Sequence, residues 1–466
     1  MKKLTLQFLL ILFAGFSYAQ SEVAYLLNHT PNSDKIEVVL EFETLPSSSI
    51  KLVIPRSAPG TYELTNYFAF VDQVKGYTVS GKTLNGIMGD GSYFLFEESD
   101  ESVKKISYEV DVRKMELDLL GSYASSKMRD NYLGILGYSV FGFVEGLESK
   151  PIELTINTNK DWPIFSTLRP SIEQKKGTDF YEVDNFSLLV DAQFLLGKAV
   201  QIFQVKDAEI PLFVAAYSET PINMEEIGRR GLLSLNGLAN YFGYIPMPHY
   251  TMCYEFLKPI SRLHDYGFSM EHLNSMTASM DTSKAILAYQ ENANIGTIVH
   301  HIGHSWLPLR SYGTGYRPFE WQTAPIIETI WMNEGFMWYI SFYNVLNDKT
   351  IPFYFFNKNM DEAPDYIQEK SLKDLSILGS TQYGLDFRIG KNLFSRGALL
   401  AHDLDVVIQE KTSGEKSFKD AILGLLNWTK ENGRAFEYDQ IESIMSEATG
   451  VDLKDVWDEW QKPRKK

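Results

Sequence analysis

The spacing of apolar residues changes near residue 205, and this change limits the folds that the chain can adopt. Before it, apolar and polar residues alternate with short turns between, as in the run Ile106, Tyr108, Val110 and Val112. A period of two predicts antiparallel sheets that are solvated on one face. Two such sheets bury their apolar faces most simply as a β-sandwich. We therefore expect an N-terminal antiparallel β-sandwich domain over residues 20–205.

Beyond residue 205 helical spacing dominates, with few strands. Residues 223–242 predict a helix that ends at Gly243, residues 249–257 a strand, and residues 267–279 an edge strand that runs into a loop. Ser417 and Asp420 have the spacing of a capping box at the start of a later helix. The fold class is therefore α+β, with a mixed domain over residues 206–345 and a C-terminal helical domain over residues 346–466.

The N-terminus has the features of a secretory signal peptide. Two lysines precede a mostly apolar run, and Ser17, Tyr18 and Ala19 form a small-x-small cleavage site. We expect residues 1–19 to be removed near Ala19 and the protein to be exported, periplasmic or secreted. No later stretch is long and apolar enough to span a bilayer, and Cys253 is the only cysteine, so no internal disulfide can form.

The net charge of the chain limits the kinds of partner that it can bind. The formal net charge is −16 at pH 7. This charge argues against binding of nucleic acid and of anionic membrane surfaces, because both would be repelled. The composition leaves the oligomeric state open.

Two histidines and a glutamate have the spacing of a catalytic metal site. Residues 295–306 carry an apolar stripe at helical spacing, and His300 and His304 lie one turn apart on another face. Glu334 follows in a second apolar stretch of helical length. Two imidazoles and one carboxylate can hold one Zn²⁺ and leave its fourth position open. The alternative is a polar helix face and an ordinary buried glutamate without a metal.

The residue after the first histidine departs from the motif of zinc hydrolases. In H-E-x-x-H the glutamate is the general base that takes a proton from the attacking water. Here that position is His301. An imidazole with a pKa near ~6.5 can act as a base, but it differs from a carboxylate in reach and charge. His301 is therefore either a substitute base or the mark of an inactive site.

Six segments in the same order resemble the glycyl aminopeptidases, metallopeptidase family sixty-one, over nearly the whole mature chain. They are Ala58-Pro59-Gly60-Thr61-Tyr62 with Asn66-Tyr67, residues 188–197 (LLVDAQFLLG), Gly267-x-x-Met270-Glu271-His272-x-Asn274-Ser275, the spacing from His304 to Glu334, Trp331-x-x-Glu334-Gly335-Phe336, and Arg396 to Leu400 with Leu404-Asp405. The resemblance implies a thermolysin-like zinc metallopeptidase domain over residues 206–345. It also implies release of small N-terminal residues, such as Gly or Ala, by attack of zinc-bound water.

The resemblance assigns roles to individual residues. It implies that His300, His304 and Glu334 bind zinc, and that Gly267, Met270, Glu271 and His272 hold the N-terminal end of a peptide or protein. Two catalytic positions differ from the family pattern. The general-base glutamate is replaced by His301, and the tyrosine that bonds the tetrahedral intermediate is replaced by Phe394.

These replacements predict weak or lost peptidase activity on a retained zinc site. Loss of a general base costs on the order of 10² to 10⁴ in rate, and loss of an oxyanion contact a further ~10² to 10³. Three alternatives stay open. The first is a pseudopeptidase that binds peptides or interacts with another protein. The second is an enzyme with His301 as base, and the third is a metal-free scaffold.

Overall fold

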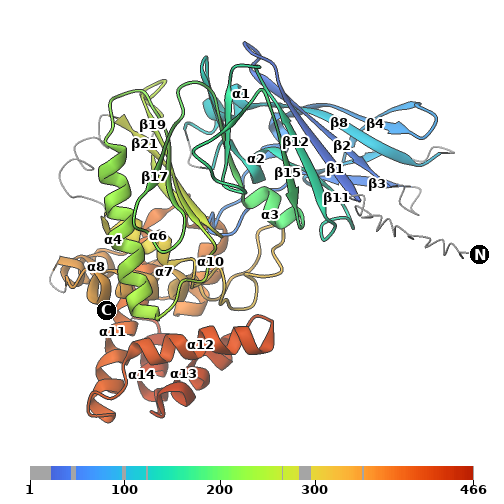
Figure 1. Ribbon diagram of the computed structural model, residues 1–466. Helices are drawn as coiled ribbons and strands as arrows, with labels where there is room; N and C mark the ends of the chain where they lie inside the picture. Colours follow the sequence, from blue (N-terminus) through green and yellow to red (C-terminus); the bar gives the residue numbers. More distant parts are fainter. Residues whose placement is uncertain are drawn as a thin grey trace, which may run out of the picture.

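The computed structural model describes residues 22–43, 49–96, 101–121, 124–264, 266–282, 295–348 and 351–464. An all-β part, a central five-stranded sheet and a C-terminal group of helices follow one another along the chain (Figure 1). The expected α+β class is confirmed. The predicted signal peptide, residues 1–19, lies outside the described residues. No described helix has the length and apolar character needed to cross a membrane.

The N-terminal part consists of three sheets. The largest has the strand order β15-β12-β1-β2-β8-β4-β5, the second β14-β13-β16-β10-β9, and the third β11-β3-β7-β6. Their strands are β1 (Val23–His29), β2 (Lys35–Phe42), β3 (Ile50–Val53), β4 (Val71–Thr78), β5 (Thr83–Asn85), β6 (Ile87–Met88), β7 (Tyr93–Phe96), β8 (Val103–Asp111), β9 (Lys127–Arg129), β10 (Tyr132–Leu136), β11 (Phe143–Val144), β12 (Ile152–Asn157), β13 (Pro163–Ser166), β14 (Lys175–Lys176), β15 (Thr178–Val183) and β16 (Gln193–Leu196). The short helices are η1 (Tyr67–Phe70), α1 (Val112–Asp118), α2 (Gly137–Val140) and α3 (Phe186–Asp191).

The pairing in these sheets is antiparallel as predicted, with one exception. Strands β1 and β12 run parallel, from Val23 opposite Ile152 to Asn28 opposite Asn157. A parallel pair joins strands far apart in sequence, and the alternation of side chains is the same in both directions, so the pattern could not reveal it. Val112, expected at a strand end, instead begins helix α1, because the Asp111 side chain accepts a hydrogen bond from Lys114 N at 2.8 Å.

The central sheet has the order β17-β18-β19-β21-β20. Its strands are β17 (Gln201–Val205), β18 (Leu212–Ser218), β19 (Tyr250–Leu257), β20 (Gly267–His272) and β21 (Ser275–Asp281). The edge strand predicted over residues 267–279 is present, but the expected loop after it is a second strand, β21. That strand is buried on both faces, so it lacks the alternation by which a strand is recognised.

Helices cover this sheet and carry the histidines. Helix α4 (Met224–Phe242) starts at the predicted place, where Asn223 caps Glu226 N at 3.0 Å, and ends at Gly243 with φ +84°. Helix α6 (Ile295–Gly303) ends earlier than the apolar stripe suggested, so Trp306 lies beyond it. Helix α7 (Ile330–Tyr339) continues into the π-helix η2 (Ile340–Val345).

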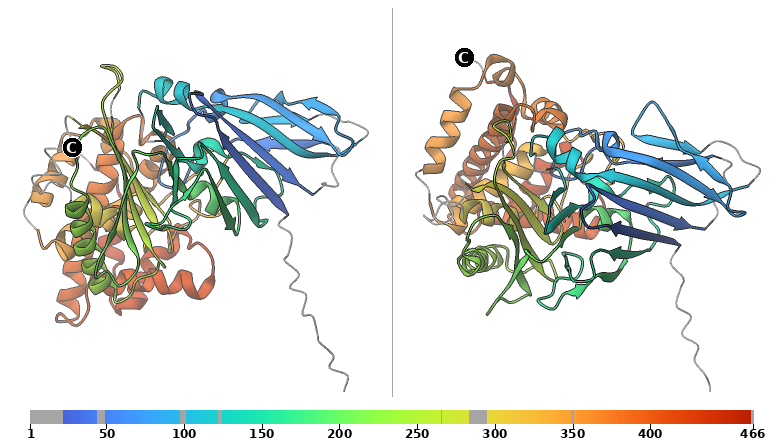
Figure 2. Two further views of the ribbon diagram at one scale, coloured as in Figure 1. Left: turned by 45° about the horizontal axis from the view of Figure 1, so that its top comes forward. Right: turned by 90° about the horizontal axis from the view of Figure 1, so that it is seen from above.

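The C-terminal helices pack against α7 and share its core. They are α8 (Ile351–Asp361), α9 (Asp365–Gln368), α10 (Leu372–Gln382), α11 (Phe387–Lys411), α12 (Phe418–Asn432), η3 (Tyr438–Gln440), α13 (Ile441–Thr449) and α14 (Lys454–Gln461). The capping box of Ser417 and Asp420 at the start of α12 is confirmed. One continuous apolar core runs from the central sheet through Trp306 and Trp331 to Leu400 and Leu425. The views from other sides show these helices on the far side of the central sheet from the N-terminal strands (Figure 2).

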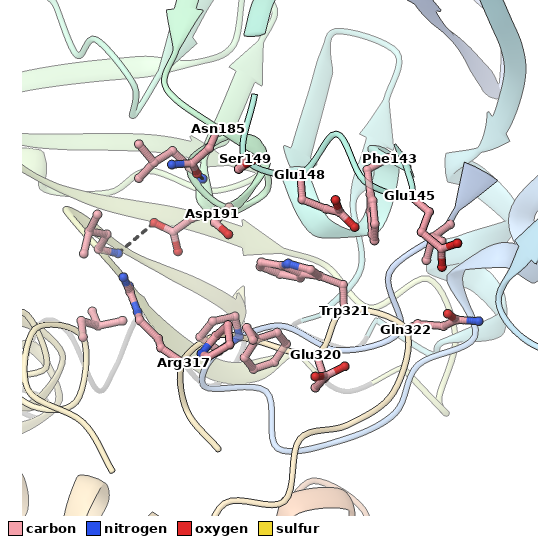
Figure 3. A pocket seen from close by; sticks show the side chains of 18 residues that line it. Phe143, Glu145, Glu148, Ser149, Asn185, Asp191, Arg317, Glu320, Trp321 and Gln322 are labelled. Atoms are coloured by element: carbon pink, nitrogen blue, oxygen red, sulfur yellow. Dashed lines mark hydrogen bonds between the residues drawn. The ribbon is translucent and has the colours of Figure 1, made fainter. Parts of the chain in front are cut away.

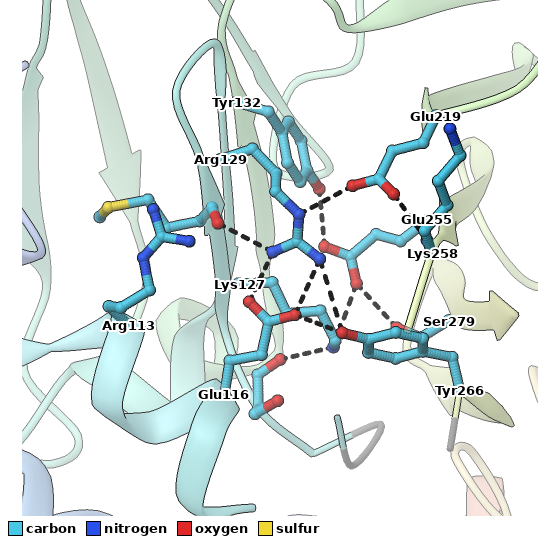
Figure 4. Close-up of polar contacts among 12 residues, drawn as sticks. Arg113, Glu116, Lys127, Arg129, Tyr132, Glu219, Glu255, Lys258, Tyr266 and Ser279 are labelled. Carbon is cyan, nitrogen blue, oxygen red and sulfur yellow. Dashed lines mark hydrogen bonds and ion pairs between the residues drawn. The ribbon is translucent and has the colours of Figure 1, made fainter. Parts of the chain in front are cut away.

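A buried polar network joins the N-terminal part to the central sheet (Figure 4). Arg129 on β9 donates to Glu116 of α1 at 2.6 Å and to Glu219, just after β18, at 2.8 Å. Tyr266, just before β20, donates to Glu116 at 2.7 Å. The network fixes the edge strand β20 against the N-terminal part, and β20 carries one wall of the site described next.

Candidate metal centre and its cleft

Helices α6 and α7 bring together the three residues predicted to bind a metal. His300 Nε2 lies 3.1 Å from Glu334 Oε2 and 2.9 Å from His304 Nε2, and His304 Nε2 lies 3.5 Å from the same carboxylate. All three residues are buried. Gly303 lies where α6 meets α7, and a Cβ there would lie 2.0 Å from Cε at the end of the Met337 side chain.

The donor set and its spacing fit a zinc ion. Ligand atoms at Zn–N and Zn–O distances of about 2.0–2.1 Å around a tetrahedron are about 3.3 Å from each other, close to the separations found here. His304 Nδ1 lies 2.9 Å from the carbonyl oxygen of Leu307. If Nδ1 donates there, the lone pair of Nε2 faces the cluster, which is the usual support of a zinc-bound histidine.

Burial and neighbouring charges shift the pKa values of the three clustered groups in different directions. Burial and then the charge of His304 lower the pKa of His300 to about 4. Burial also opposes a charge on His304, but the carboxylates of Glu271 and Glu334 outweigh it and raise its pKa to about 9. Burial opposes ionisation of Glu334, yet His304 and His300 hold its pKa well below its usual range. A neutral imidazole, His300, and a cationic one, His304, thus face the Glu334 carboxylate. A divalent cation could bind to these three groups in place of the proton on His304.

His301 lies beside the cluster but outside it. Its Nδ1 is 2.8 Å from the carbonyl oxygen of Thr297, one turn earlier on α6. Its ring centroid lies 5.2 Å from that of His300 and 5.9 Å from that of His304. Burial, followed by His300 and His304, lowers its pKa to about 3. The structure therefore places an imidazole with one free nitrogen at the wall of the cleft, where H-E-x-x-H proteins have a carboxylate.

Strand β20 gives its alternate residues to the cleft. Gly267 and Glu271 line it, whereas Met270 lies in the N-terminal core and the Nδ1 atom of His272 lies 3.1 Å from Asp191. Side chains of a strand point alternately to its two faces, so the four residues predicted to hold a peptide divide into two pairs.

Glu271 is a cleft residue with an unsatisfied hydrogen-bond acceptor. It is buried, its Oε1 has no hydrogen-bond partner among the described residues, and burial raises its pKa. Gly60, which has φ +87°, makes room for it, because a Cβ there would lie 2.7 Å from Oε1. A buried carboxylate without a donor calls for a cation or a proton.

The cleft encloses about 170 Å³. It is lined by Gly60, Tyr62, Gly267, Ser269, Glu271, Thr297, His300, His301, Glu334, Trp338, Tyr383, Phe387 and Phe394. Phe394 is present as predicted and packs near Trp338, with ring centroids 5.8 Å apart. Ser269, Tyr383 and Phe387 were not among the residues predicted for the site. The bridge between Glu63 and Gln382 brings the Tyr383 segment to the cleft, and pairing across so long a separation leaves no local pattern.

A larger cavity of about 670 Å³ lies elsewhere, between the N-terminal part and the 307–324 connection (Figure 3). Trp321, Arg317 and Asp191 lie around it, and none of the three clustered metal-binding residues lines it. Asp191 is already engaged by His272 and by the backbone N–H of Leu273 at 2.9 Å.

Comparison with known proteins supports a metallopeptidase relationship. Residues 25–198 match the Peptidase M61 N-terminal domain. A search of curated proteins finds no match. Among solved structures, an aminopeptidase N family protein from Idiomarina loihiensis superposes with a TM-score of 0.80 at 17% identity, over 95% of this chain and 76% of that chain.

Two further solved structures share the fold at lower similarity. The M1 zinc metallopeptidase from Deinococcus radiodurans has a TM-score of 0.56 at 11% identity, over 95% of this chain and 94% of that chain. Native yeast LTA4 hydrolase has a TM-score of 0.57 at 13% identity, over 95% of this chain and 68% of that chain. The chain therefore carries an M61-type N-terminal domain on an aminopeptidase-like fold, with a buried His-His-Glu cluster consistent with the zinc site of such proteins.

Proposed function

We propose that this protein is a glycyl-aminopeptidase-like zinc protein that binds peptide amino-termini and hydrolyses peptides weakly or not at all. The observation that carries the proposal is the content of one cleft. It is lined by Glu271 and by two of the candidate ligands, His300 and Glu334, and the third, His304, belongs to the same buried cluster. His301 and Phe394 stand where hydrolysis needs a carboxylate and a phenol.

Zinc held by His300, His304 and Glu334 would polarise a peptide carbonyl as a Lewis acid. Glu271 would bind the α-ammonium of the peptide, because its buried carboxylate has an unpartnered oxygen and a cation offsets the cost of burial. The small volume of the cleft favours N-terminal Gly or Ala over larger residues. A variant of the Deinococcus radiodurans metallopeptidase is bound to a Tyr-Ser-Ala substrate, which supports a peptide as the ligand class.

In the proposed hydrolysis, proton transfer is the step that the replacement of the glutamate by His301 impairs. His301 is held through Nδ1 by the Thr297 carbonyl, so only Nε2 could accept a proton, in an orientation fixed by the helix. A carboxylate at the same position offers two equivalent oxygens. Phe394 has no group that could donate to a developing oxyanion. Together these two replacements could lower the rate by on the order of 10⁴ or more.

Export is part of the proposal and rests on the signal-peptide pattern of residues 1–19 alone. The mature chain would begin near Gln20 and act in a periplasm or outside the cell.

The decisive experiment is peptide hydrolysis by the chain from Gln20 on substrates with N-terminal Gly and Ala, with and without a zinc chelator. The native protein is compared with His301→Glu and with His301→Gln, which is similar in size to glutamate but has no base. We expect little turnover in the native protein and in His301→Gln, and a chelator-sensitive gain of at least ~10² in His301→Glu.

The other outcomes separate the rival functions. Chelator-sensitive turnover in the native protein that His301→Gln abolishes would make His301 the base and contradict the proposal. If none of the three proteins hydrolyses peptides, but each retains one bound zinc and its peptide affinity, the result would favour a pseudopeptidase that acts by binding. Absence of bound zinc in the purified protein would favour a metal-free scaffold.

A further inference from the structure

A third cavity, of about 940 Å³, lies on the other side of helix α11 from the cleft beside the histidines. Arg396 lines it, only two residues from Phe394, and residues two apart on a helix point to nearly opposite sides. The remaining wall comes from α8, from the end of α14 and from the segment after it. The lining is Phe353, Asn357, Met360, Arg396, Leu399, Asp403, Glu459, Trp460, Lys462, Pro463 and Arg464.

Arg396 is a buried cation that forms no ion pair with any residue in the described part of the chain. It is 1% exposed. Its Nη1 donates to the carbonyl oxygen of Lys370 at 2.9 Å and its Nη2 to that of Lys462 at 3.3 Å, whereas Nε has no partner among the described residues. Burial, together with the charge of Arg464, lowers its pKa to about 10. A buried charge that is not paired is costly, so this arrangement needs an explanation.

Arg464 adds a second guanidinium group, on a side chain that is 38% exposed. Its Nη1 is buried without a partner, and its only ion pair among the described residues is a long one, from Nη2 to Asp361 at 3.7 Å. Its backbone N–H donates to the carbonyl oxygen of Gln368 at 2.9 Å, which fixes the segment beside α11. Two like charges are thus held near each other with free donors.

The acidic residues of the cavity are already engaged. Asp403 accepts from Trp460 Nε1 at 2.8 Å, and its other oxygen lies 3.1 Å from His402 Nδ1. Glu459 is paired with Lys462 at 2.7 Å. Neither carboxylate forms an ion pair with either arginine within 4.0 Å in the described part of the chain.

We propose that this cavity binds the oxyanion group, carboxylate or phosphoryl, of a small ligand between Arg396 and Arg464. The planar guanidinium fork matches both groups and forms strong charge-assisted hydrogen bonds with them. An anion there would relieve the repulsion between the two cations. Phe353, Met360 and Leu399 offer apolar wall to the rest of the ligand. The site does not depend on zinc or on peptide hydrolysis.

The test is calorimetric titration of the mature chain with inorganic phosphate and, separately, with acetate, against chloride at equal ionic strength. We expect one saturable site per chain for at least one of the two anions, and the preferred anion identifies the group. Arg464→Met should weaken that binding at least about tenfold, because it removes a charged donor pair. Arg464 is the residue substituted in the test, because Arg396→Met would also remove two structural hydrogen bonds.

Arg434→Met is the matched control. Arg434 is an exposed arginine of the same helical region, 4.8 Å over the Trp428 ring, and its removal should leave the affinity unchanged. Heat no larger than that of chloride for both anions would overturn the proposal. Saturable binding of equal strength in Arg464→Met would overturn it too, because the anion would then be bound elsewhere, for example at the metal centre.

Discussion

At the scale of single residues, the proposed function assigns a different loss to each replacement: the oxyanion donor at Phe394 and the general base at His301. Phe394 is 5% exposed at the cleft wall, so a hydroxyl on its ring could face a bound peptide. Phe394→Tyr in the His301→Glu background should raise kcat/KM by a further ~10-fold to 10³-fold, because it restores a donor to the developing oxyanion. The measurement is kcat/KM for a Gly-terminated peptide across the double-mutant cycle.

Phe394→Tyr alone should change almost nothing, since without a base there is little transition state to stabilise. If the single variant gains as much as the double variant does over His301→Glu, His301 already serves as the base.

Gly60 leaves the space that the Glu271 carboxylate occupies, and Glu271 is the group proposed to bind a peptide amino-terminus. A methyl group at residue 60 would meet the Glu271 carboxylate at 2.7 Å, and the backbone around that turn is held by neighbouring hydrogen bonds. Gly60→Ala should therefore weaken the binding of Gly- and Ala-terminated peptides at least about tenfold, with zinc content unchanged. Calorimetry with free and N-acetylated peptides is the readout.

Gly81→Ala is the matched control for that experiment. Gly81 has the same φ of +87° but has nothing within 4 Å of the added carbon, so it carries the same backbone strain without the contact. Equal loss of peptide affinity in both variants would show that strain, and not the Glu271 contact, is responsible.

At the scale of helices, the position of the candidate ligand Glu334 depends on how closely α7 and α11 approach each other. They cross where Gly335 faces Gly397, and a Cβ on Gly397 would lie 1.9 Å from the carbonyl oxygen of Trp331. Backbone cannot move aside as a side chain can. Gly397→Ala should therefore cost about 3 kcal/mol or more of unfolding free energy and reduce zinc occupancy, because α7 must shift. Urea unfolding and metal analysis measure the two effects.

Gly379→Ala on α10 provides the comparison. Its added carbon would meet the end of the Leu393 side chain at 2.7 Å, which can rotate away, so a change within about 1 kcal/mol is expected. Full zinc occupancy in Gly397→Ala would show that Glu334 does not depend on this crossing.

Single elements with local signals were predictable from sequence. Helix α4 has its cap and its terminal glycine within the sequence pattern, and so does α12. The metal cluster was predictable for the same reason, because four-residue spacing on one helix is local. Strand β21, the parallel pairing of β1 with β12, and the presence of Tyr383 in the cleft depend on contacts between distant segments. No property of one segment encodes such contacts, so they could not be found from the pattern.

At the scale of the whole molecule, several polar contacts join the N-terminal part to the central sheet, among them those of the largely buried Arg129 and the ion pair between Lys127 and Glu255. Glu116 is fully buried and its partners are Arg129 and Tyr266 (Figure 4). Arg129→Met would remove the cation that is hydrogen-bonded to this carboxylate. Removal of one partner of a buried pair costs about 3–5 kcal/mol, and here the cost falls on the junction that holds strand β20. Arg113→Met, which loses only an exposed pair with Asp34 at 3.3 Å, should cost less than about 1 kcal/mol.

The pH dependence of the stability lost in Arg129→Met distinguishes an electrostatic role of Arg129 from a packing role. Burial opposes ionisation of Glu116, but the hydrogen bonds and charge of Arg129 outweigh it and hold the pKa of Glu116 below its usual range. A carboxyl group whose pKa is lowered by folding stabilises the protein above its unfolded pKa, and this contribution is lost as the pH falls through the folded pKa. In Arg129→Met the carboxylate can be protonated instead. The difference in unfolding free energy between native protein and variant, measured by urea unfolding, should therefore be largest near pH 7 and shrink toward pH 4. A difference that stays constant over this range would mean that Arg129 acts through packing alone.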